Sequence, residues 1–198
     1  MRNFLIILIF SVIFSSVNGQ TNKDWNGSYA GLLVSEQVGL RSVYRDDIIQ
    51  SYSPEELKGA MGGIFFGHLI QKESYVYGGE ITLSKGDVKI TDRPATHIPG
   101  FTDFRIKRGS VNGNQLVSAG IGYFTDELVP ACVATCGKAR VEGVSFTIGV
   151  DYLIGNQVII GGQYVHRSIG KSTYTKLDNI WETDGTNNAI EFRVGYKF

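Results

Sequence analysis

The sequence predicts an all-β fold, in which eight antiparallel strands close into an up-and-down transmembrane β-barrel. Three observations favour this fold. After an apolar N-terminal leader, no segment is long enough to form a membrane-spanning helix. The rest of the chain alternates apolar and polar side chains over long stretches, which is the period of a strand with two different faces. The connections between these stretches are alternately tight and long, as in transmembrane barrels.

Residues 1–19 have the pattern of a signal peptide. Arg2 supplies a positive charge, and an apolar run follows at residues 4–14. A run of this length suits a signal-peptide core and is shorter than the ~20 residues of a membrane helix. An uncleaved anchor is the alternative. Residues 20–198 then form one barrel domain, because domains commonly have roughly 100 to 200 residues.

Composition excludes some classes of function. Glycine supplies 25 of the 198 residues without a collagen-like period, so it is used inside folded structure. The 19 basic residues balance the 19 acidic ones, which gives no electrostatic attraction to nucleic acids. We therefore expect no nucleic-acid partner, and no residue pattern indicates a cofactor or a metal ion.

Eight segments show a period of two. Most have about ten residues or more, which exceeds the five or six of soluble sheets and suits a tilted strand that crosses a bilayer. In chain order, the expected strands are residues 27–38, 59–71, 75–88, 101–111, 115–127, 140–154, 157–169 and 187–198.

Tight and long connections alternate between these strands. QKES at 71–74, VNGN at 111–114 and GN at 155–156 are turn sequences, because Asn-Gly and Gly-Asn pairs favour hairpins. Alternate connections of an up-and-down barrel share a rim, so we expect three short turns at one end and four long loops at the other. Within the first loop, SPEELKG at 53–59 has the spacing of a capping box, which predicts one helical turn.

The regular strands have one apolar, aromatic face and one small, polar or charged face. In the strand at 75–88, for example, Ile81 and Leu83 alternate with Glu80, Thr82 and Ser84. We expect the apolar face to contact lipid, because small residues suit the narrow lumen of an eight-stranded barrel. A secreted, lipocalin-like carrier with the apolar face around a ligand is the alternative.

Two sets of residues follow from this orientation. Polar side chains on the inner face would pair in a closed lumen. They are Glu80, Asp151, Gln163, Arg167, Glu191, Arg193 and Lys197. Aromatic side chains near the strand ends would form girdles at the membrane interfaces. They are Trp25, Tyr29, Tyr77, Tyr123, Tyr152, Tyr164, Trp181 and Tyr196.

Two strands are less regular. IFFGHLI at 64–70 is apolar on both faces. In DFRIKRGS at 103–110, Arg108 falls beside Ile106 on the apolar face. Either a β-bulge shifts the register there, or the arginine reaches along the surface to the interface.

Six segments carry a resemblance to a known family. They are DWNGSYAGLL at 24–33, GGIFFGHLIQ at 62–71, VYGGEITLS at 76–84, LVSAGIGYF at 116–124, GGQYVHRSIG at 161–170 and the terminal FRVGYKF. In this order and spacing they resemble the small outer-membrane β-barrels of proteobacteria, the porin-like surface antigens related to the membrane domain of OmpA.

The resemblance implies a non-enzymatic, cofactor-free barrel of the Gram-negative outer membrane. It would have a packed polar lumen and act in envelope integrity and in surface contacts through long loops. The implied partners are membrane lipids, lipopolysaccharide, the assembly machinery, and host or surface ligands at the loops. That machinery would read the alternating last strand with Tyr196 and the terminal Phe198. Glutamate is common in the family where this chain has Gln163, so one lumen salt bridge would be missing.

Three short motifs point to other chemistry. Cys132 and Cys136 of PACVATCGK would form a disulfide in the third long loop of an exported protein, with two free thiols as the alternative. A zinc site is not expected, because no histidine lies near this single pair. GKST at 170–173 lacks the earlier glycine of a phosphate-binding loop.

His166 and Ser168 share a strand face, and Glu182 follows in the last loop. This arrangement resembles the outer-membrane lipid A deacylases, although Ile169 stands where that family has an asparagine. A lipid A-modifying esterase is therefore one alternative function. A narrow pore is another, although an eight-stranded lumen is normally filled by side chains.

Overall fold

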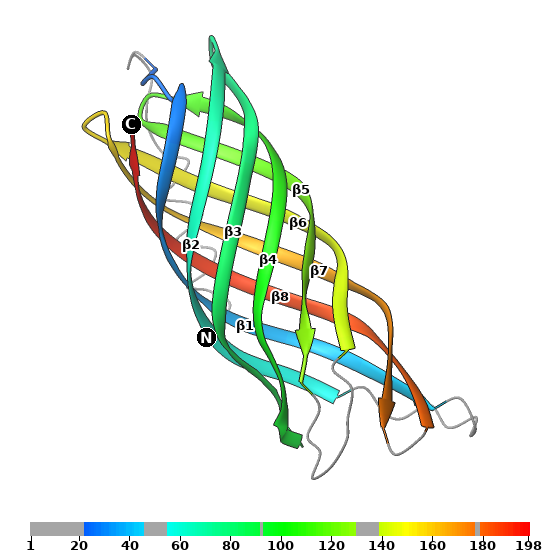
Figure 1. Cartoon of the computed structure of the whole chain (residues 1–198). Coiled ribbons are helices and arrows are strands. Elements are labelled where there is room, and N and C mark those ends of the chain that lie inside the picture. Colours follow the sequence, from blue (N-terminus) through cyan, green and yellow to red (C-terminus); the bar gives the residue numbers. More distant parts are fainter. Residues whose placement is uncertain (1–21, 46–54, 92, 130–138, 177–178) are drawn as a thin grey trace, which may run out of the picture.

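The computed structural model describes residues 22–45, 55–91, 93–129, 139–176 and 179–198, which form one closed barrel (Figure 1). Every strand pairs antiparallel with its neighbour in sequence, and β8 pairs with β1 to close the ring. The strands are β1 (Gly27–Arg45), β2 (Glu55–Lys72), β3 (Tyr75–Ile90), β4 (Arg93–Asn112), β5 (Gln115–Leu128), β6 (Ala139–Ile154), β7 (Val158–Lys176) and β8 (Asn179–Lys197). The predicted fold class is confirmed.

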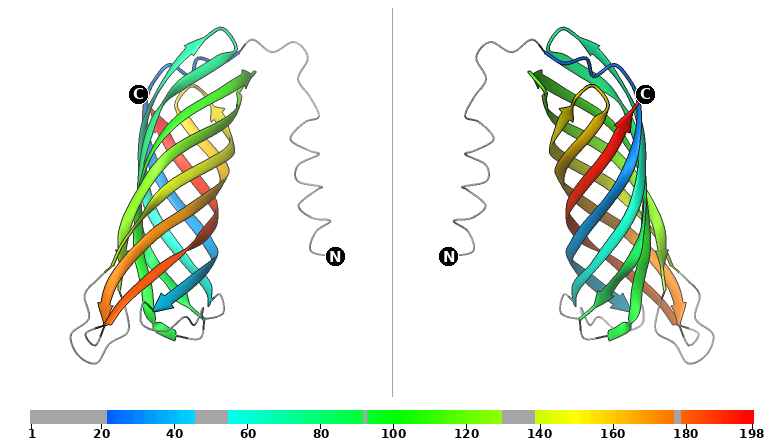
Figure 2. Two further views of the ribbon diagram at one scale, coloured as in Figure 1. Left: turned by 90° about the vertical axis from the view of Figure 1, so that its right-hand side faces the viewer. Right: turned by 90° about the vertical axis from the view of Figure 1, so that its left-hand side faces the viewer.

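Three tight turns lie at one end of the barrel, which we call the turn end (Figure 2). Gly113 and Gly155 have φ angles of 61° and 64°, the left-handed region that glycine enters without steric cost. The predicted hairpin turns are therefore confirmed. The opposite end, which we call the loop end, carries the other four connections. In the described residues, no helix is long and apolar enough to cross a membrane.

The strands reach further toward the loop end than the sequence predicts. β3 ends at Ile90 and β4 begins at Arg93, while β7 ends at Lys176 and β8 begins at Asn179. Two of the four predicted long loops are therefore strand. The strands have 14 to 20 residues, whereas a bilayer needs about 9 to 11. The barrel wall thus continues well beyond one membrane thickness.

The helical turn predicted at 53–59 is wrong over its described part, because β2 begins at Glu55. Glu55 pairs with Arg41 of β1, and Leu57 pairs with Gly39. The cross-strand ladder satisfies the backbone groups that a capping box would satisfy locally, and tertiary pairing overrides the local signal. Residues 53 and 54 lie outside the described residues.

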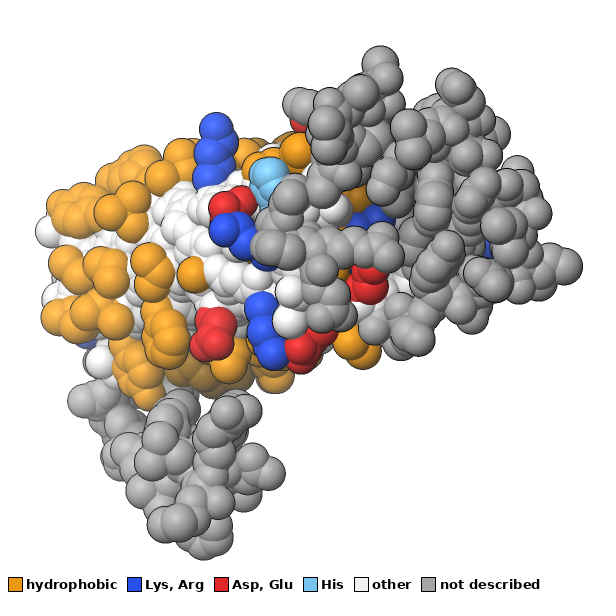
Figure 3. Space-filling view, turned by 90° about the horizontal axis from the view of Figure 1, so that it is seen from below, with side chains coloured by type: hydrophobic (Ala, Val, Ile, Leu, Met, Phe, Trp, Pro, Cys, Tyr) orange, Lys and Arg blue, Asp and Glu red, His pale blue; other side chains and the backbone are white. Residues whose placement is uncertain are grey.

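The outer face differs between the two halves of the barrel (Figure 3). In the half next to the turn end, which we call the turn half, large apolar side chains point outward and form an apolar belt. It includes Leu32, Val34, Ile64, Phe66, Ile81, Leu83, Phe104, Ile106, Ile121, Phe146, Ile148, Ile160, Phe192 and Val194. In the other half, the loop half, the outer face is mainly polar or charged, with Lys58, Lys85, Asp87, Lys89, Arg140, Glu142 and Lys171. Val38 and Leu40 of β1 are apolar exceptions there.

The orientation predicted for the two faces is confirmed, because the apolar face points outward in β3, β6, β7 and β8. An exposed apolar band around a barrel is far larger than the patches of a few hundred Å² found on soluble monomers. A lipocalin-like carrier would place this face inside. Hydrocarbon is therefore the solvent that fits the outer surface of the turn half.

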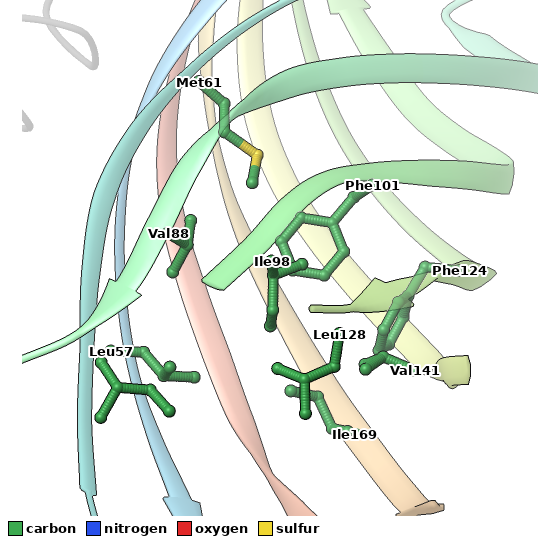
Figure 4. Close-up of a cluster of buried hydrophobic side chains, with 10 residues drawn as sticks. Leu57, Met61, Val88, Ile98, Phe101, Phe124, Leu128, Val141 and Ile169 are labelled. Atoms are coloured by element: carbon green, nitrogen blue, oxygen red, sulfur yellow. The ribbon is translucent and has the colours of Figure 1, made fainter. Parts of the chain in front are cut away.

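The lumen is layered rather than uniformly polar, which corrects the packed polar lumen expected from the sequence. A cluster of apolar side chains fills each end. The turn-end cluster contains Trp25, Tyr29, Leu33, Phe65, Leu69, Val76, Val111, Leu116, Leu153 and Ile159. The loop-end cluster, shown in Figure 4, contains Leu57, Met61, Val88, Ile90, Ile98, Phe101, Phe124, Leu128, Val141 and Ile169. Polar side chains occupy the layer between them.

The layering explains the irregular strands. IFFGHLI is apolar on both faces because Phe65 and Leu69 point into the turn-end cluster while Phe66 points outward. Arg108 points outward like Ile106, and the pairing of β4 with β5 shows no register shift. No bulge is present there, so the bulge alternative is wrong, and Arg108 lies exposed on the outer face.

The predicted aromatic girdles are partly wrong. Tyr77, Tyr123, Tyr164 and Tyr196 point outward, as expected, and Tyr152 is half-buried. Trp25 and Tyr29 instead lie inside the turn-end cluster, almost fully buried. A plugged lumen needs large apolar side chains at its ends, so aromatic residues near a strand end do not all face lipid. The side chain of Trp181 lies outside the described residues.

Candidate functional site

Four carboxylates and four cationic side chains lie together in the middle of the lumen. We call this group the charged layer. Their side chains are buried, and the two kinds of charge are equal in number, so the layer carries no net charge. Its members are Glu80, Asp103, Asp151, Glu191, Arg105, Lys107, Arg167 and Arg193.

Glu80 of β3 is the centre of one half of this layer. Its Oε2 atom accepts hydrogen bonds from Arg193 Nη2 at 2.6 Å, Tyr29 Oη at 2.8 Å and Lys107 Nζ at 3.2 Å. Arg105 Nη1 lies 3.7 Å from Glu80 Oε1. Hydrogen bonds between ionised groups are stronger than neutral ones. One carboxylate therefore ties β3 to β1, β4 and β8.

Arg167 of β7 is the centre of the other half. Its Nη2 atom lies 2.8 Å from Asp103 Oδ2 and 3.3 Å from Glu191 Oε1. Arg105 Nη2 also lies 3.2 Å from Asp103 Oδ2. Because Arg105 contacts both Asp103 and Glu80, it joins the two halves into one network.

Gln163 links acid and base within the layer. Its Nε2 atom donates to Glu191 Oε2 at 2.6 Å, and its Oε1 atom accepts from Arg193 Nη1 at 3.2 Å. A glutamate here would have no amide hydrogen for Glu191 and would repel it. The neutral Gln163 therefore satisfies both Glu191 and Arg193. The family resemblance implies a missing salt bridge at this position, and these two hydrogen bonds take its place.

Small residues on the neighbouring strands β5 and β6 leave space for these long side chains. On β5, a Cβ atom at Gly122 would lie 2.8 Å from Cγ of Arg105. On β6, Ser145 and Thr147 face the lumen and are buried. The glycine content noted in the sequence thus gives the charged layer its room.

The two central arginines connect the charged layer to the apolar clusters. The Cζ atom of Arg193 lies 3.9 Å from the ring centre of Phe65, in the turn-end cluster. The Cζ atom of Arg167 lies 4.5 Å from the ring centre of Phe101, in the loop-end cluster. Such cation–π contacts are worth about 2 kcal/mol when desolvated. The charged layer is therefore in direct contact with both apolar clusters.

The charged layer is packed inside the barrel. The side chains of Glu80, Asp103 and Arg105 are 0% exposed, so no substrate reaches them from outside. In the part of the chain that the structure describes, no three acidic, histidine or cysteine side chains group as ligands for a metal ion.

The structure places most of the predicted lumen residues in this layer. Glu80, Asp151, Gln163, Arg167, Glu191 and Arg193 all lie there. Lys197 lies apart from it at the turn end. Tyr196 and Phe198 point outward, next to each other on the face of the last strand. Residues 1–19, Cys132 and Cys136 lie outside the described residues.

Sequence reasoning missed Asp103, Arg105 and Lys107 of β4. They alternate with Phe104 and Ile106, and this signal was available in DFRIKRGS. The outward Arg108 obscured it, because it makes the lipid side of the strand look charged. If each of the two faces of residues 103–107 is considered separately, Phe104 and Ile106 mark the outer face, and the three charged residues fall on the inner face.

Residues 22–26 form an N-terminal strap across the turn end. Lys23 N donates to Gly113 O at 2.8 Å, and Trp25 N donates to Gln71 Oε1 at 2.7 Å. Lys23 Nζ reaches Asn156 Oδ1 at 3.2 Å. The strap is therefore hydrogen-bonded to the region of all three tight turns, and it inserts Trp25 into the turn-end cluster.

Lys197 fastens the strap to the last strand. Its Nζ atom donates to the backbone oxygens of Asp24 and Asn26 at 2.7 and 2.8 Å. Asp24 lies before β1, and the backbone amide of Asn26 donates to its carboxylate. That hydrogen bond, with the Asn26 side chain and the Lys197 charge, lowers the pKa of Asp24 below its ordinary value.

The outward residues of the esterase alternative are not assembled as a triad. His166 Nδ1 lies 2.8 Å from Asn188 Oδ1 of β8. Ser168 pairs across the strands with Thr186, whereas Glu182 pairs with Thr173, five residues further along β7. GKST at 170–173 is part of the same strand and forms no phosphate-binding loop.

Neither a protein-family model nor a curated protein sequence matches the chain. Solved structures do match it. The outer membrane protein OprG from Pseudomonas aeruginosa superposes with a TM-score of 0.58 at 13% identity, over 91% of this chain and 99% of OprG. The attachment invasion locus protein Ail of Yersinia pestis gives 0.43 at 11% identity, over 87% and 99%. The Neisserial surface protein A gives 0.42 at 15% identity, over 85% and 99%.

Of these three structures, OprG alone exceeds a TM-score of 0.5, so it carries the fold assignment. Its likeness agrees with the closed ring of eight strands and with the apolar belt. The resemblance stated from the sequence is thereby confirmed at the level of fold: the chain has the architecture of the small β-barrels of bacterial outer membranes.

Proposed function

We propose that this protein is a non-conducting, non-enzymatic barrel of the outer membrane that anchors a rigid wall for contacts at the cell surface and supports the envelope. The turn half would span the bilayer, with the turns in the periplasm. The loop half would project outward. Lipids and lipopolysaccharide would surround the belt, and the outward Tyr196 and Phe198 would be available to the assembly machinery.

One observation carries this proposal: a charge-balanced layer fills the middle of the lumen between two apolar clusters. Ion conduction needs a continuous polar path of adequate width. Here the path would pass through ten buried apolar side chains at each end. The charged side chains between the two clusters pair with one another, at N···O distances of 2.6 to 3.8 Å. A narrow pore is therefore the weaker reading.

The projecting wall changes how surface contacts would be made. Because the connections of β3 to β4 and β7 to β8 are short, much of the surface beyond the belt is strand. Its outer face carries charges of both signs, including the pairs Lys58–Glu56 and Arg140–Glu142. Contacts with surface ligands would thus involve a stiff, charged wall in addition to loops.

The decisive experiment measures conductance and location together. The protein, folded in detergent, is added to planar bilayers, while membranes of expressing cells are fractionated and run on unboiled gels. We expect heat-modifiable migration in the outer-membrane fraction and no steady channels. Large, steady channels would refute the closed lumen, and a freely soluble periplasmic protein would refute the membrane assignment.

A variant sharpens the conductance test. Replacing Arg193 and Phe65 together by alanine removes the stacked contact between the charged layer and the turn-end cluster. We expect this double variant to give brief, small openings, whereas the wild type stays silent. If both were equally silent, the contact would not be the narrowest barrier.

A further inference from the structure

The seam between β8 and β1 closes the ring, and its pairing register decides the shear of the barrel (Figure 1). In the middle of the seam, Val34 of β1 lies opposite Phe192 of β8. A slip of β8 by one residue would turn its polar face toward lipid, whereas a slip by two keeps every side chain on its own face. Because shear, tilt and diameter are linked, a slip by two would build a different ring from the same strands.

The outer face of the seam does not select between these registers. Both strands carry large apolar side chains there, in alternate positions. They are Leu32 and Val34 on β1, and Ile190, Phe192, Val194 and Tyr196 on β8. A slip by two would again bring apolar side chains opposite one another, and the backbone would form nearly the same ladder. Selection of one register therefore falls to the inner face.

Two glycines make a narrow place on the inner face of the seam, which we call the glycine notch. Gly31 of β1 lies opposite Gly195 of β8, and the ring of Phe65 from β2 lies against both. A Cβ atom would lie 2.5 Å from Phe65 Cζ at Gly31 and 2.9 Å from it at Gly195, which is too close for either. The inward neighbours of Gly195 along β8 are Arg193 and Lys197. A slip by two in either direction would therefore push a Cβ atom into the ring.

Arg193 of β8 adds an attraction to this steric exclusion. Its Nη2 atom lies 2.6 Å from Oε2 of Glu80 on β3, and its Cζ atom lies 3.9 Å from the ring centre of Phe65. Strand residues rise about 3.3 Å each, so a slip by two would move Arg193 by about 6.6 Å along the seam. The guanidinium group would then leave a carboxylate that is buried in the lumen.

We infer that the glycine notch and the Arg193–Glu80 pair form a register lock, which admits one alignment of the closing strand β8. The notch excludes the slipped alignments, and the ion pair stabilises the native one. Arg193 is thus a positioning residue for ring closure. The lock goes beyond the proposed function, because it decides which ring forms and does not depend on what the ring does at the cell surface.

Disulfide trapping measures the register of the seam. Val34→Cys is combined with Phe192→Cys to report the native register, and with Ile190→Cys or Val194→Cys to report the two slipped ones. Residues directly opposite have Cβ atoms about 4.5–5.5 Å apart and diagonal ones about 7–8 Å, so an oxidant joins mainly opposite pairs. Both natural cysteines are replaced by serine throughout. Each protein is folded in detergent and oxidised, and mass spectrometry of its peptides gives the ratio of slipped to native cross-links.

Two variants test the two parts of the lock. Arg193→Met removes the cation and keeps an unbranched side chain, and Gly195→Ala places a Cβ atom in the notch in the native register. We expect the ratio of slipped to native cross-links to rise about tenfold in Arg193→Met, the effect of losing one hydrogen bond between charged groups. It should also rise in Gly195→Ala, because the native register loses its steric advantage. Arg193→Lys, which keeps the charge, should stay near the wild type.

Each variant has a matched control. Lys107→Met removes another buried cation of the charged layer, but its contacts are Glu80 of β3 and Asp151 of β6, away from the seam. It should lower stability and leave the register native. Gly162→Ala adds the same methyl group on β7, where its Cβ atom would lie 3.5 Å from Glu191 O and has room.

The outcomes decide between the lock and a general effect of stability. Wild-type ratios in both Arg193→Met and Gly195→Ala would overturn the lock. Slippage in Lys107→Met equal to that in Arg193→Met would also overturn it, because the register would then follow the stability of the whole layer. Gly195→Ala changes no charge, so it carries the test if Arg193→Met loses heat-modifiable migration and is not folded. None of these results depends on conductance or location, which test the proposed function separately.

Discussion

The two halves of the barrel have similar interiors and different exteriors. Each half buries a cluster of ten apolar side chains in the lumen. On the outside, however, the turn half carries the apolar belt, whereas the loop half carries lysines, arginines and acids. The inner packing therefore follows from the need to fill a narrow ring of eight strands, and only the outer face responds to the surrounding solvent.

This difference separates two sources of stability. The inner clusters and the charged layer should stabilise the ring wherever it lies. The outer face should matter only where hydrocarbon contacts it. Substitutions on the inner face should thus have similar effects in both halves, and substitutions on the outer face should not.

The largest effect is expected in the layer that joins the two halves. Glu80→Gln removes the acid that Arg193, Lys107 and Arg105 share, and leaves buried cations without their partner. Breaking a buried ion pair costs about 3–5 kcal/mol. Urea unfolding in detergent, followed by circular dichroism, should show this loss.

The matched control for this change is Glu56→Gln, which removes an exposed pair with Lys58. Exposed pairs contribute about 0–1 kcal/mol. If the two variants unfolded at the same urea concentration, the charged layer would not stabilise the barrel.

The next effect compares the outer faces. Ile148→Arg places a cation in the apolar belt, at a cost of roughly 2–4 kcal/mol near the middle of the membrane. Ser168→Arg makes the same addition on the outer face of the loop half, where the side chain stays in water. Folding yield into vesicles should drop for the first and stay at the wild-type level for the second. Equal losses would place the membrane boundary elsewhere.

A smaller effect compares the inner clusters. Ile159→Val shortens a side chain in the turn-end cluster, and Ile98→Val does so in the loop-end cluster. Each should cost about 0.5–1.5 kcal/mol, because both side chains are almost fully buried. The free energy of unfolding of the two variants should agree. A loss confined to Ile159→Val would show that the loop half is loosely packed.

The smallest effect concerns the strap at the turn end. The pKa of Asp24 is lowered by the Asn26 amide, its side chain and Lys197. At a pH above the ordinary pKa of an aspartate, the ionised carboxylate therefore stabilises the strap. This stabilisation is lost as the pH falls through the lowered pKa of Asp24 in the folded protein. Asp24→Asn should differ slightly from the wild type at neutral pH and match it in strong acid. Hydrogen exchange of the Asn26 amide measures this, and a difference that persists in acid would contradict it.

The sequence predicted the outer surface well because lipid imposes one simple rule. Ile81, Leu83 and Ile148 alternate with polar residues, and each of them points outward. The positions of two of the three hairpin turns also followed from local residues, since Gly113 and Gly155 adopt backbone angles that few other residues accept, whereas in the third turn Glu73 takes a φ of 55°.

The lumen was harder to predict because its layers do not follow one rule. Phe65 and Tyr29 are apolar or aromatic, as lipid-facing residues are, yet they point inward. Lys107 alternates with the outward Ile106, but the outward Arg108 next to it obscures this signal. In the loop half, both faces of a strand such as β4 contain polar residues, so the alternation weakens and the strand ends are missed.

The seam between β1 and β8 sets the order of assembly. It pairs Tyr29 with Lys197 and Arg45 with Trp181, residues from opposite ends of the chain. Contacts so distant in sequence form slowly, because the intervening chain must be ordered first. Closure of the ring therefore has to wait for β8, which pairs with β1. A chain that ended before β8 would instead leave β1 and β7 as two unpaired edges of an open sheet.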